Sequence, residues 1–186
     1  STSEGPFWEA MNAAGVLQVP LVMSVWDDGH GISVPKEFQT VKQSISEALS
    51  GFQRTEDAPG FEIIKTKGWD YPHLILTYEK AVKIAREEQV PVLVHVEEVT
   101  QPQGHSTSGS HERYKSEERL QWEKDFDPIK KMREWIEANG IASNEELEVL
   151  EKSAKKDARD AKNNAWKAFL NPMKDDKAAV IQLLTG

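Results

Sequence analysis

Three short apolar runs, separated by segments with a helical period, constrain the fold of this chain more than any other feature. The runs are Val19–Trp26, Phe61–Thr66 and Val90–Val99. The first is apolar almost throughout, which is typical of a strand covered on both faces. Apolar residues recur at helical spacing in 41–52 and 73–89, between the runs. This order of strands and helices predicts an α/β fold, with a parallel sheet flanked by helices.

Further helices are predicted at both ends of the chain. Gly5 and Pro6 are typical of a helix start, and this first helix is expected to stop at Gly15. From Glu117 onward the pattern is helical, and we expect breaks at Pro128, Gly140 and Pro172. We therefore expect two parts, an α/β domain over 1–140 and a helical C-terminal extension over 141–186 that packs on the domain or leads to a further part.

Composition excludes several classes of function. The chain has 186 residues, a net charge of −8 and a pI near 5.2, so no basic face is available for nucleic acid. It has no cysteine, which excludes disulfides and thiolate metal sites. No apolar run approaches the ~20 residues that a membrane span needs. We expect a soluble, cytoplasmic protein that binds neither nucleic acid nor membrane.

Two adjacent acids follow the first predicted strand. Asp27 and Asp28 precede a Gly-His-Gly sequence centred on His30, at the carboxyl end of the strand, where parallel sheets place their ligand sites. The simplest interpretation is an ordinary turn, in which both acids bond their own backbone. Glycines on both sides of His30 favour a close approach of another group. A phosphate with its Mg²⁺ would suit this position, because Mg²⁺ takes one or two protein carboxylates and completes its shell with phosphates.

A long polar loop follows the third strand. It reads "TQPQGHSTSGSHERYKS" over 100–116 and contains His105 and His111 among hydroxyl-bearing residues that could surround an anion. A solvated linker is the alternative, since loops of this composition rarely bind anything. His73 and His95 lie in a predicted helix start and strand, and we interpret both as structural.

Two quoted motifs resemble those of one enzyme family. "SEG" at 3–5, a helix, a strand and then "DDGHGIS" at 27–33 are similar to the alpha subunit of thiamin-diphosphate-dependent 2-oxo acid dehydrogenases. In that family a Gly-Asp-Gly precedes the small-residue segment, and "NNGYAIS" follows the strand. The "GHSTSGSHERYKS" of 104–116 resembles the family's later loop. The chain therefore resembles a C-terminal fragment of the alpha subunit, or alpha half, that starts just after Gly-Asp-Gly.

The resemblance implies roles for individual residues. Asp28 would bind Mg²⁺ through its side chain and His30 through its backbone carbonyl. Ile32 would pack against thiamin diphosphate, and the Ser1 amide would meet its diphosphate. His105 would contact the diphosphate and assist acyl transfer, as the catalytic residue, while Ser106 matches a serine that mitochondrial relatives phosphorylate. Asp28, His30, Gly109 and Lys115 depart from the family's asparagine, tyrosine, aspartate and arginine.

The resemblance also implies a function. The parent would be the decarboxylating first component of a 2-oxo acid dehydrogenase complex, with acyl transfer to lipoamide. Its partners would be a beta subunit or fused beta half and a dihydrolipoyl acyltransferase with its lipoyl domain, in a homo-oligomer or an α2β2 assembly. We expect this piece to be inactive alone. An acetoin-cleaving or transketolase-like enzyme remains an alternative, and so does a non-catalytic interaction domain that docks through the Ala-rich helix.

Overall fold

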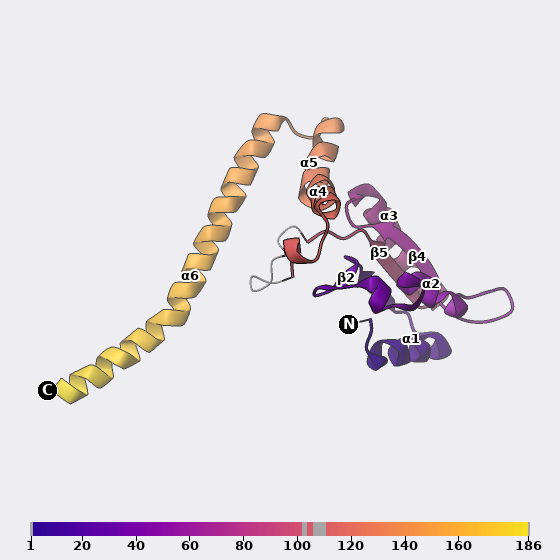
Figure 1. Cartoon of the computed structure of the whole chain (residues 1–186), viewed down its shortest axis with the longest axis horizontal. Coiled ribbons are helices and arrows are strands. Elements are labelled where there is room, and N and C mark those ends of the chain that lie inside the picture. Colours follow the sequence, from indigo (N-terminus) through magenta and orange to yellow (C-terminus); the bar gives the residue numbers. More distant parts are fainter. Residues whose placement is uncertain (1, 102–103, 106–110, 186) are drawn as a thin grey trace. The chain divides into compact units, whose positions relative to one another are not determined.

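The computed structural model of the chain describes residues 2–101, 104–105 and 111–185, and it confirms the α/β class. Three parallel strands form its main sheet, β1 (Val22–Trp26), β4 (Glu62–Lys67) and β5 (Val92–Glu97). Their order is β1-β5-β4, so the last strand in sequence lies in the middle (Figure 1). The carboxyl ends of β1 and β5 therefore lie side by side.

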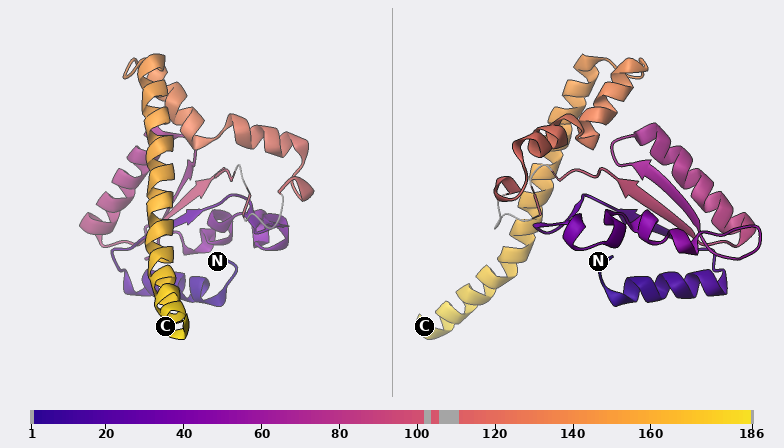
Figure 2. Two further views of the ribbon diagram at one scale, coloured as in Figure 1. Left: turned by 90° about the vertical axis from the view of Figure 1, so that its left-hand side faces the viewer. Right: turned by 45° about the vertical axis from the view of Figure 1, so that its right-hand side comes forward.

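The central strand explains how the core is organised. Side chains of β5 alternate between the faces of the sheet, and all but the last of its residues are buried. Leu93 joins a cluster with helices α1 (Gly5–Leu17) and α2 (Ile45–Ala48). On the opposite face Val92, Val94 and Val96 pack against α3 (Tyr71–Lys83) and the π-helical turn η4 (Ile84–Glu88). Figure 2 shows α3 and α1 on opposite sides of the sheet.

The prediction that both faces of the first strand are covered is wrong. Val25 is buried, but Trp26 is 71% exposed. The reason is position, because β1 is an end strand of the described sheet and α3 covers it only near Val22 and Ser24. The apolar run alone could not distinguish an end strand from a central one.

Short elements replace the single helix expected over 41–52. They are η2 (Val41–Gln43), α2 and η3 (Ser50–Phe52). Lys42 and Gln43 have left-handed φ values of 63° and 55°, which interrupt any continuous helix. Ser44 then begins α2, where its side chain accepts the amide of Glu47. A small hairpin of β2 (His30–Gly31) and β3 (Val34–Pro35), followed by η1 (Lys36–Phe38), was not predicted.

Helices follow β5, as expected. They are η5 (His111–Arg113), α4 (Glu117–Asp125) and α5 (Pro128–Ala138). The break at Pro128 is confirmed, because α4 ends before this residue and α5 begins at it. The chain divides into two compact units, residues 1–134 and 135–186.

The second unit is dominated by one long helix, α6 (Asn144–Thr185). The break expected at Pro172 is wrong, since the helix continues through this residue. Because the helix around Pro172 is exposed, water can bind the Ala168 carbonyl that loses its helical donor. Among the helices in the described part of the chain, none combines the length and apolar content needed to cross a bilayer.

Candidate functional site

A cleft of about 980 Å³ opens in the first unit, where β1 and β5 end. Residues that follow β1 and residues that follow β5 both contribute to its wall, as expected at the carboxyl edge of a parallel sheet. Polar lining residues include Asp27, Asp28, His30, Lys36, Gln39, Ser44, Gln101 and His105, and apolar ones include Phe7, Met23, Trp26 and Ile32. The cleft thus combines an apolar wall with acidic and basic groups.

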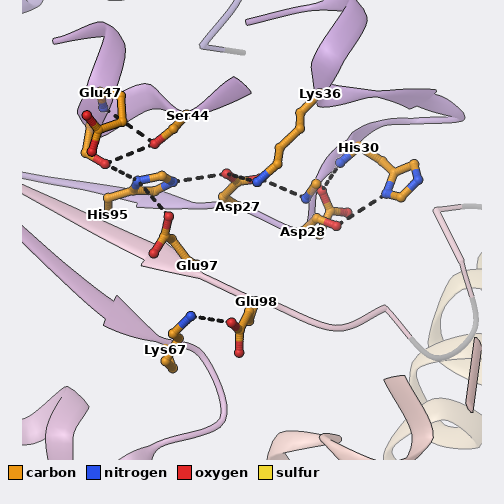
Figure 3. A network of polar contacts seen from close by, with 12 residues as sticks. Asp27, Asp28, His30, Lys36, Ser44, Glu47, Lys67, His95, Glu97 and Glu98 are labelled. Atoms are coloured by element: carbon orange, nitrogen blue, oxygen red, sulfur yellow. Dashed lines mark hydrogen bonds and ion pairs between the residues drawn. The ribbon is translucent and has the colours of Figure 1, made fainter. Parts of the chain in front are cut away.

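Asp27 points into the protein and is fixed by several donors. Its Oδ2 accepts a hydrogen bond from His95 Nε2 at 3.0 Å, and its Oδ1 accepts one from the Gly29 amide at 2.8 Å (Figure 3). Burial alone would raise the pKa of Asp27, but these two bonds and the Lys36 cation outweigh it and hold that pKa below its ordinary range. Asp27 is therefore a half-buried anion, with 15% of its side chain exposed.

Asp28 and His30 form a tight turn at the edge of the cleft. Asp28 Oδ1 accepts the His30 amide at 3.0 Å. Among the hydrogen bonds of the described residues none engages Asp28 Oδ2. The Lys36 amide donates to the Gly29 carbonyl at 2.9 Å, which makes His30 and Pro35 a non-hydrogen-bonded pair of the hairpin. The His30 carbonyl therefore points out of the hairpin ladder.

Ile32 has an unusual backbone. Its φ is 60°, a left-handed value that a β-branched residue adopts only under strain, and its side chain is 64% exposed while lining the cleft. Strain of this kind is concentrated at functional sites. The glycine at position 31 has another cause. A Cβ there would collide with the side-chain amide of Gln39, so the group that approaches Gly31 closely belongs to the chain itself.

The segment after β5 reaches the same cleft through His105. Farther along, the Tyr114 ring lies against the His30 imidazole with centroids 5.7 Å apart. Lys115 Nζ donates to Glu123 Oε1 at 2.7 Å, and both side chains are almost fully buried. The Arg119 Nε donates to the same oxygen at 3.0 Å. These contacts fix the end of the loop beside the Asp28–His30 turn.

The structure brings Asp28, His30, Ile32 and His105 together around one cleft, while Ser1 and Ser106 lie outside the described residues. Sequence reasoning missed the side chains that support them, chiefly His95 and Arg119. A polar residue in an otherwise apolar strand was the only signal for His95. Nothing in the sequence pattern pointed to Arg119.

The donors at the turn fit Mg²⁺ held together with phosphate. No group of three His, Asp or Glu side chains among the described residues is arranged to hold a metal. Mg²⁺ does not require such a group, because it commonly takes one or two carboxylates and obtains its other ligands from water and phosphates. Asp28 Oδ2, which no described residue engages, and the outward carbonyl of His30 are suitable donors.

Comparison with known proteins gives a consistent result. The family model described as "Dehydrogenase E1 component" matches residues 1–173. The chain is 33% identical to 2-oxoisovalerate dehydrogenase subunit alpha 2, mitochondrial, of Arabidopsis thaliana, over 86% of this chain and 32% of the relative. It is 30% identical to 3-methyl-2-oxobutanoate dehydrogenase subunit alpha of Mycobacterium tuberculosis, over 87% of this chain and 42% of the relative.

A third relative is the pyruvate dehydrogenase E1 component subunit alpha of Porphyra purpurea, which is 30% identical over 84% of this chain and 43% of the relative. The chain thus spans less than half the length of these curated relatives.

Proposed function

The chain belongs to the dehydrogenase E1 component family, and from that premise we propose that it supplies part of the thiamin diphosphate and Mg²⁺ site of a 2-oxo acid dehydrogenase alpha subunit. One observation carries this proposal, the cleft lined by Asp28, His30, Ile32 and His105. Relatives named for branched-chain 2-oxo acids and for pyruvate support an oxidoreductase that acts on this substrate class.

Each lining residue has a proposed task. Asp28, through its second carboxylate oxygen, and His30, through its carbonyl, hold Mg²⁺. Ile32 presents an apolar surface, and His105 donates to the diphosphate and acts as the catalytic residue in acyl transfer. Thiamin diphosphate, when bound, supplies the nucleophilic carbon that makes decarboxylation of a 2-oxo acid possible. The roles of Ser1 at the diphosphate and of Ser106 in the loop stay predictions, because both residues lie outside the described part of the chain.

The charges of the cleft favour binding of metal and diphosphate together. Asp27 and Asp28 would repel a diphosphate that arrived alone, because like charges interact strongly in a partly buried site. A bound Mg²⁺ would add positive charge beside the two carboxylates and so make binding of the diphosphate favourable. Lys36, whose Nζ lies 3.8 Å from Asp27 Oδ2, adds a second positive charge at the wall.

The remaining features of the parent are also proposals. They are a beta subunit or fused beta half, a lipoyl-bearing acyltransferase, an α2β2 or homo-oligomeric assembly and a cytoplasmic location. We propose a partial cofactor-binding domain over 1–140 and a helical extension over 141–186. This chain alone is expected to bind thiamin diphosphate weakly and not to turn over.

The test is an assay of the complete protein assembled with its beta portion. We expect CO₂ release from pyruvate or branched-chain 2-oxo acids that requires both thiamin diphosphate and Mg²⁺. Asp28→Ala should abolish it, whereas Asp57→Ala, in an exposed loop, should not. Turnover of acetoin or sugar phosphates instead would support the alternative enzymes. An assembly that binds no thiamin diphosphate would contradict the proposal and favour an interaction domain.

A further inference from the structure

A buried histidine joins the cleft to the core of the first unit. His95 lies in β5 with 0% of its side chain exposed. Its Nε2 contacts Asp27 Oδ2 at 3.0 Å, and its Nδ1 contacts Ser46 Oγ at 2.9 Å. Ser46 Oγ lies in turn 3.2 Å from Ser44 Oγ, and Ser44 lines the cleft. The chain of contacts links the end of β1, the middle of the sheet and the start of α2.

The position of His95 in the strand calls for an explanation. The neighbouring residues Leu93, Val94 and Val96 are apolar and buried, so an apolar side chain would be the default at this position. A buried imidazole is costly unless its nitrogens are bonded. Both nitrogens of His95 have partners, and one of these partners is a residue of the cleft.

The backbone of Asp27 is fixed on both sides. Its amide donates to the Val96 carbonyl at 2.8 Å, and its carbonyl accepts the Val99 amide at 3.1 Å. Only the side-chain torsions of Asp27 remain to be set. His95 sets them by holding Oδ2, which leaves Oδ1 facing the Gly29 amide at 2.8 Å. Without His95, the carboxylate could turn toward Lys36, whose Nζ now lies 3.8 Å from Oδ2.

The direction of the hydrogen bond is fixed at the Asp27 end of the link and open at the Ser46 end. Asp27 is a carboxylate, so Nε2 must carry the hydrogen and donate. The Ser46 hydroxyl can donate to Nδ1 or accept from it, and the Ser44 hydroxyl can rotate to accept from Ser46 or donate to it accordingly. Glu97, whose Oε1 lies 3.9 Å from Nδ1, is a further charged group near the ring.

We propose that His95 is a positioning residue of the cleft, which fixes the Asp27 carboxylate and through it the turn that presents Asp28 and His30. Its effect on Mg²⁺ rests on the function proposed above. Its effect on the turn does not, because that effect follows from the contacts of His95, Asp27 and Gly29 alone. The proposal therefore has one test in the free chain and one with metal.

The first test is amide hydrogen exchange of Gly29 in this chain, followed by NMR. His95→Leu should accelerate exchange at Gly29 by about tenfold, the size expected for loss of one hydrogen bond. His73→Leu is the matched control, because His73 Nδ1 also contacts a hydroxyl, Thr66 Oγ1 at 2.9 Å, but does not line the cleft. The control should leave Gly29 exchange unchanged.

A spectroscopic signature separates positioning from mere packing. We expect the Nε2–H of His95 to give a slowly exchanging signal in a ¹⁵N–¹H correlation, and Asp27→Ala should remove it. If His95→Leu fails to fold, Ser46→Ala provides the deciding measurement, since it keeps the His95 imidazole but removes the hydroxyl that contacts its Nδ1. That variant should accelerate Gly29 exchange severalfold. Unchanged Gly29 exchange in a folded His95→Leu or Ser46→Ala chain would overturn the proposal.

The second test titrates Mg²⁺ into the complete protein assembled with its beta portion, with saturating thiamin diphosphate. His95→Leu should raise the apparent Kd for Mg²⁺ by about tenfold or more, as for other residues that orient metal ligands. His73→Leu should leave it unchanged. If the unsubstituted assembly binds no Mg²⁺, the proposed function is contradicted, and the Gly29 exchange still decides the role of His95. Normal Mg²⁺ affinity in His95→Leu would overturn the positioning role.

Discussion

The guanidinium of Arg119 donates from Nη2 to the backbone carbonyl of Asp28 at 3.0 Å. This bond joins residues that are 91 positions apart in the sequence. Arg119 also lies over the Trp122 ring at 4.6 Å and donates from Nε to Glu123. The acidic turn after β1 and helix α4 are therefore tied together at the residue that we propose as a metal ligand.

Loss of Arg119 should loosen this turn. Arg119→Ala leaves the Asp28 carbonyl without its guanidinium donor, and we expect the free energy of unfolding to fall by about 1 to 3 kcal/mol. Denaturant unfolding measures it, with Arg113→Ala as a control because Arg113 is exposed in the same segment. Equal stability of the two variants would show that the bond does not stabilise the fold.

The buried pair of Lys115 and Glu123 should matter more. Their side chains are 2% and 1% exposed, and removing one partner leaves a buried charge with too few contacts. We expect Lys115→Met to lower the free energy of unfolding by about 3 kcal/mol. Lys130→Met is the control, since the Lys130 side chain is 48% exposed and its ion pairs should contribute less than about 1 kcal/mol. A smaller loss for Lys115→Met than for the control would contradict this ranking.

Glu98 should contribute to stability in a pH-dependent way. Burial alone would raise its pKa, but hydrogen bonds from Lys67 and Trp69 outweigh it and lower that pKa in the folded chain. The contribution of Glu98 is therefore present above its unfolded pKa of about 4.5 and is lost as pH falls through the lower, folded value. Thermal unfolding across this range should show a shallower acid decline for Glu98→Gln than for the original chain.

Glu79→Gln, on the exposed surface of α3, provides the comparison. It removes one carboxylate without touching the Lys67 and Trp69 contacts of Glu98. If both variants change the acid decline equally, the bonds to Glu98 do not account for it.

Pro172 should locally destabilise the C-terminal half of α6. Pro172 has no amide to donate to the Ala168 carbonyl, and a proline inside a helix costs about 3 kcal/mol relative to alanine. We therefore expect Pro172→Ala to slow amide exchange in residues 168–176 and to raise the helical signal in circular dichroism. Lys156→Ala, on an exposed surface of α6 well before that segment, should have little effect on those amides. Unchanged exchange in Pro172→Ala would show that the helix already tolerates the proline.

Sequence periodicity was sufficient for the sheet because β5 is buried from both sides and reads as an apolar run, and β4 carries the adjacent apolar residues Ile63 and Ile64. It failed for Trp26, since an end strand and a central strand can have the same pattern. It failed at Pro172 because a solvated helix can bind water where the proline interrupts it. Local patterns also identified the Asp28–His30 turn. They could not identify His95 and Arg119, whose partners lie 68 and 91 residues away.

The central claim is that Asp28 and His105 serve one cation and its diphosphate in a single cleft. It is tested most directly by adding Mn²⁺ and thiamin diphosphate to this chain and following the histidine side-chain signals by NMR, because a paramagnetic ion broadens nearby nuclei even when it binds weakly. The account predicts that His30 and His105 broaden before His73, and that Asp28→Ala abolishes this selectivity. Equal broadening of all three histidines, or selective broadening that survives Asp28→Ala, would contradict it.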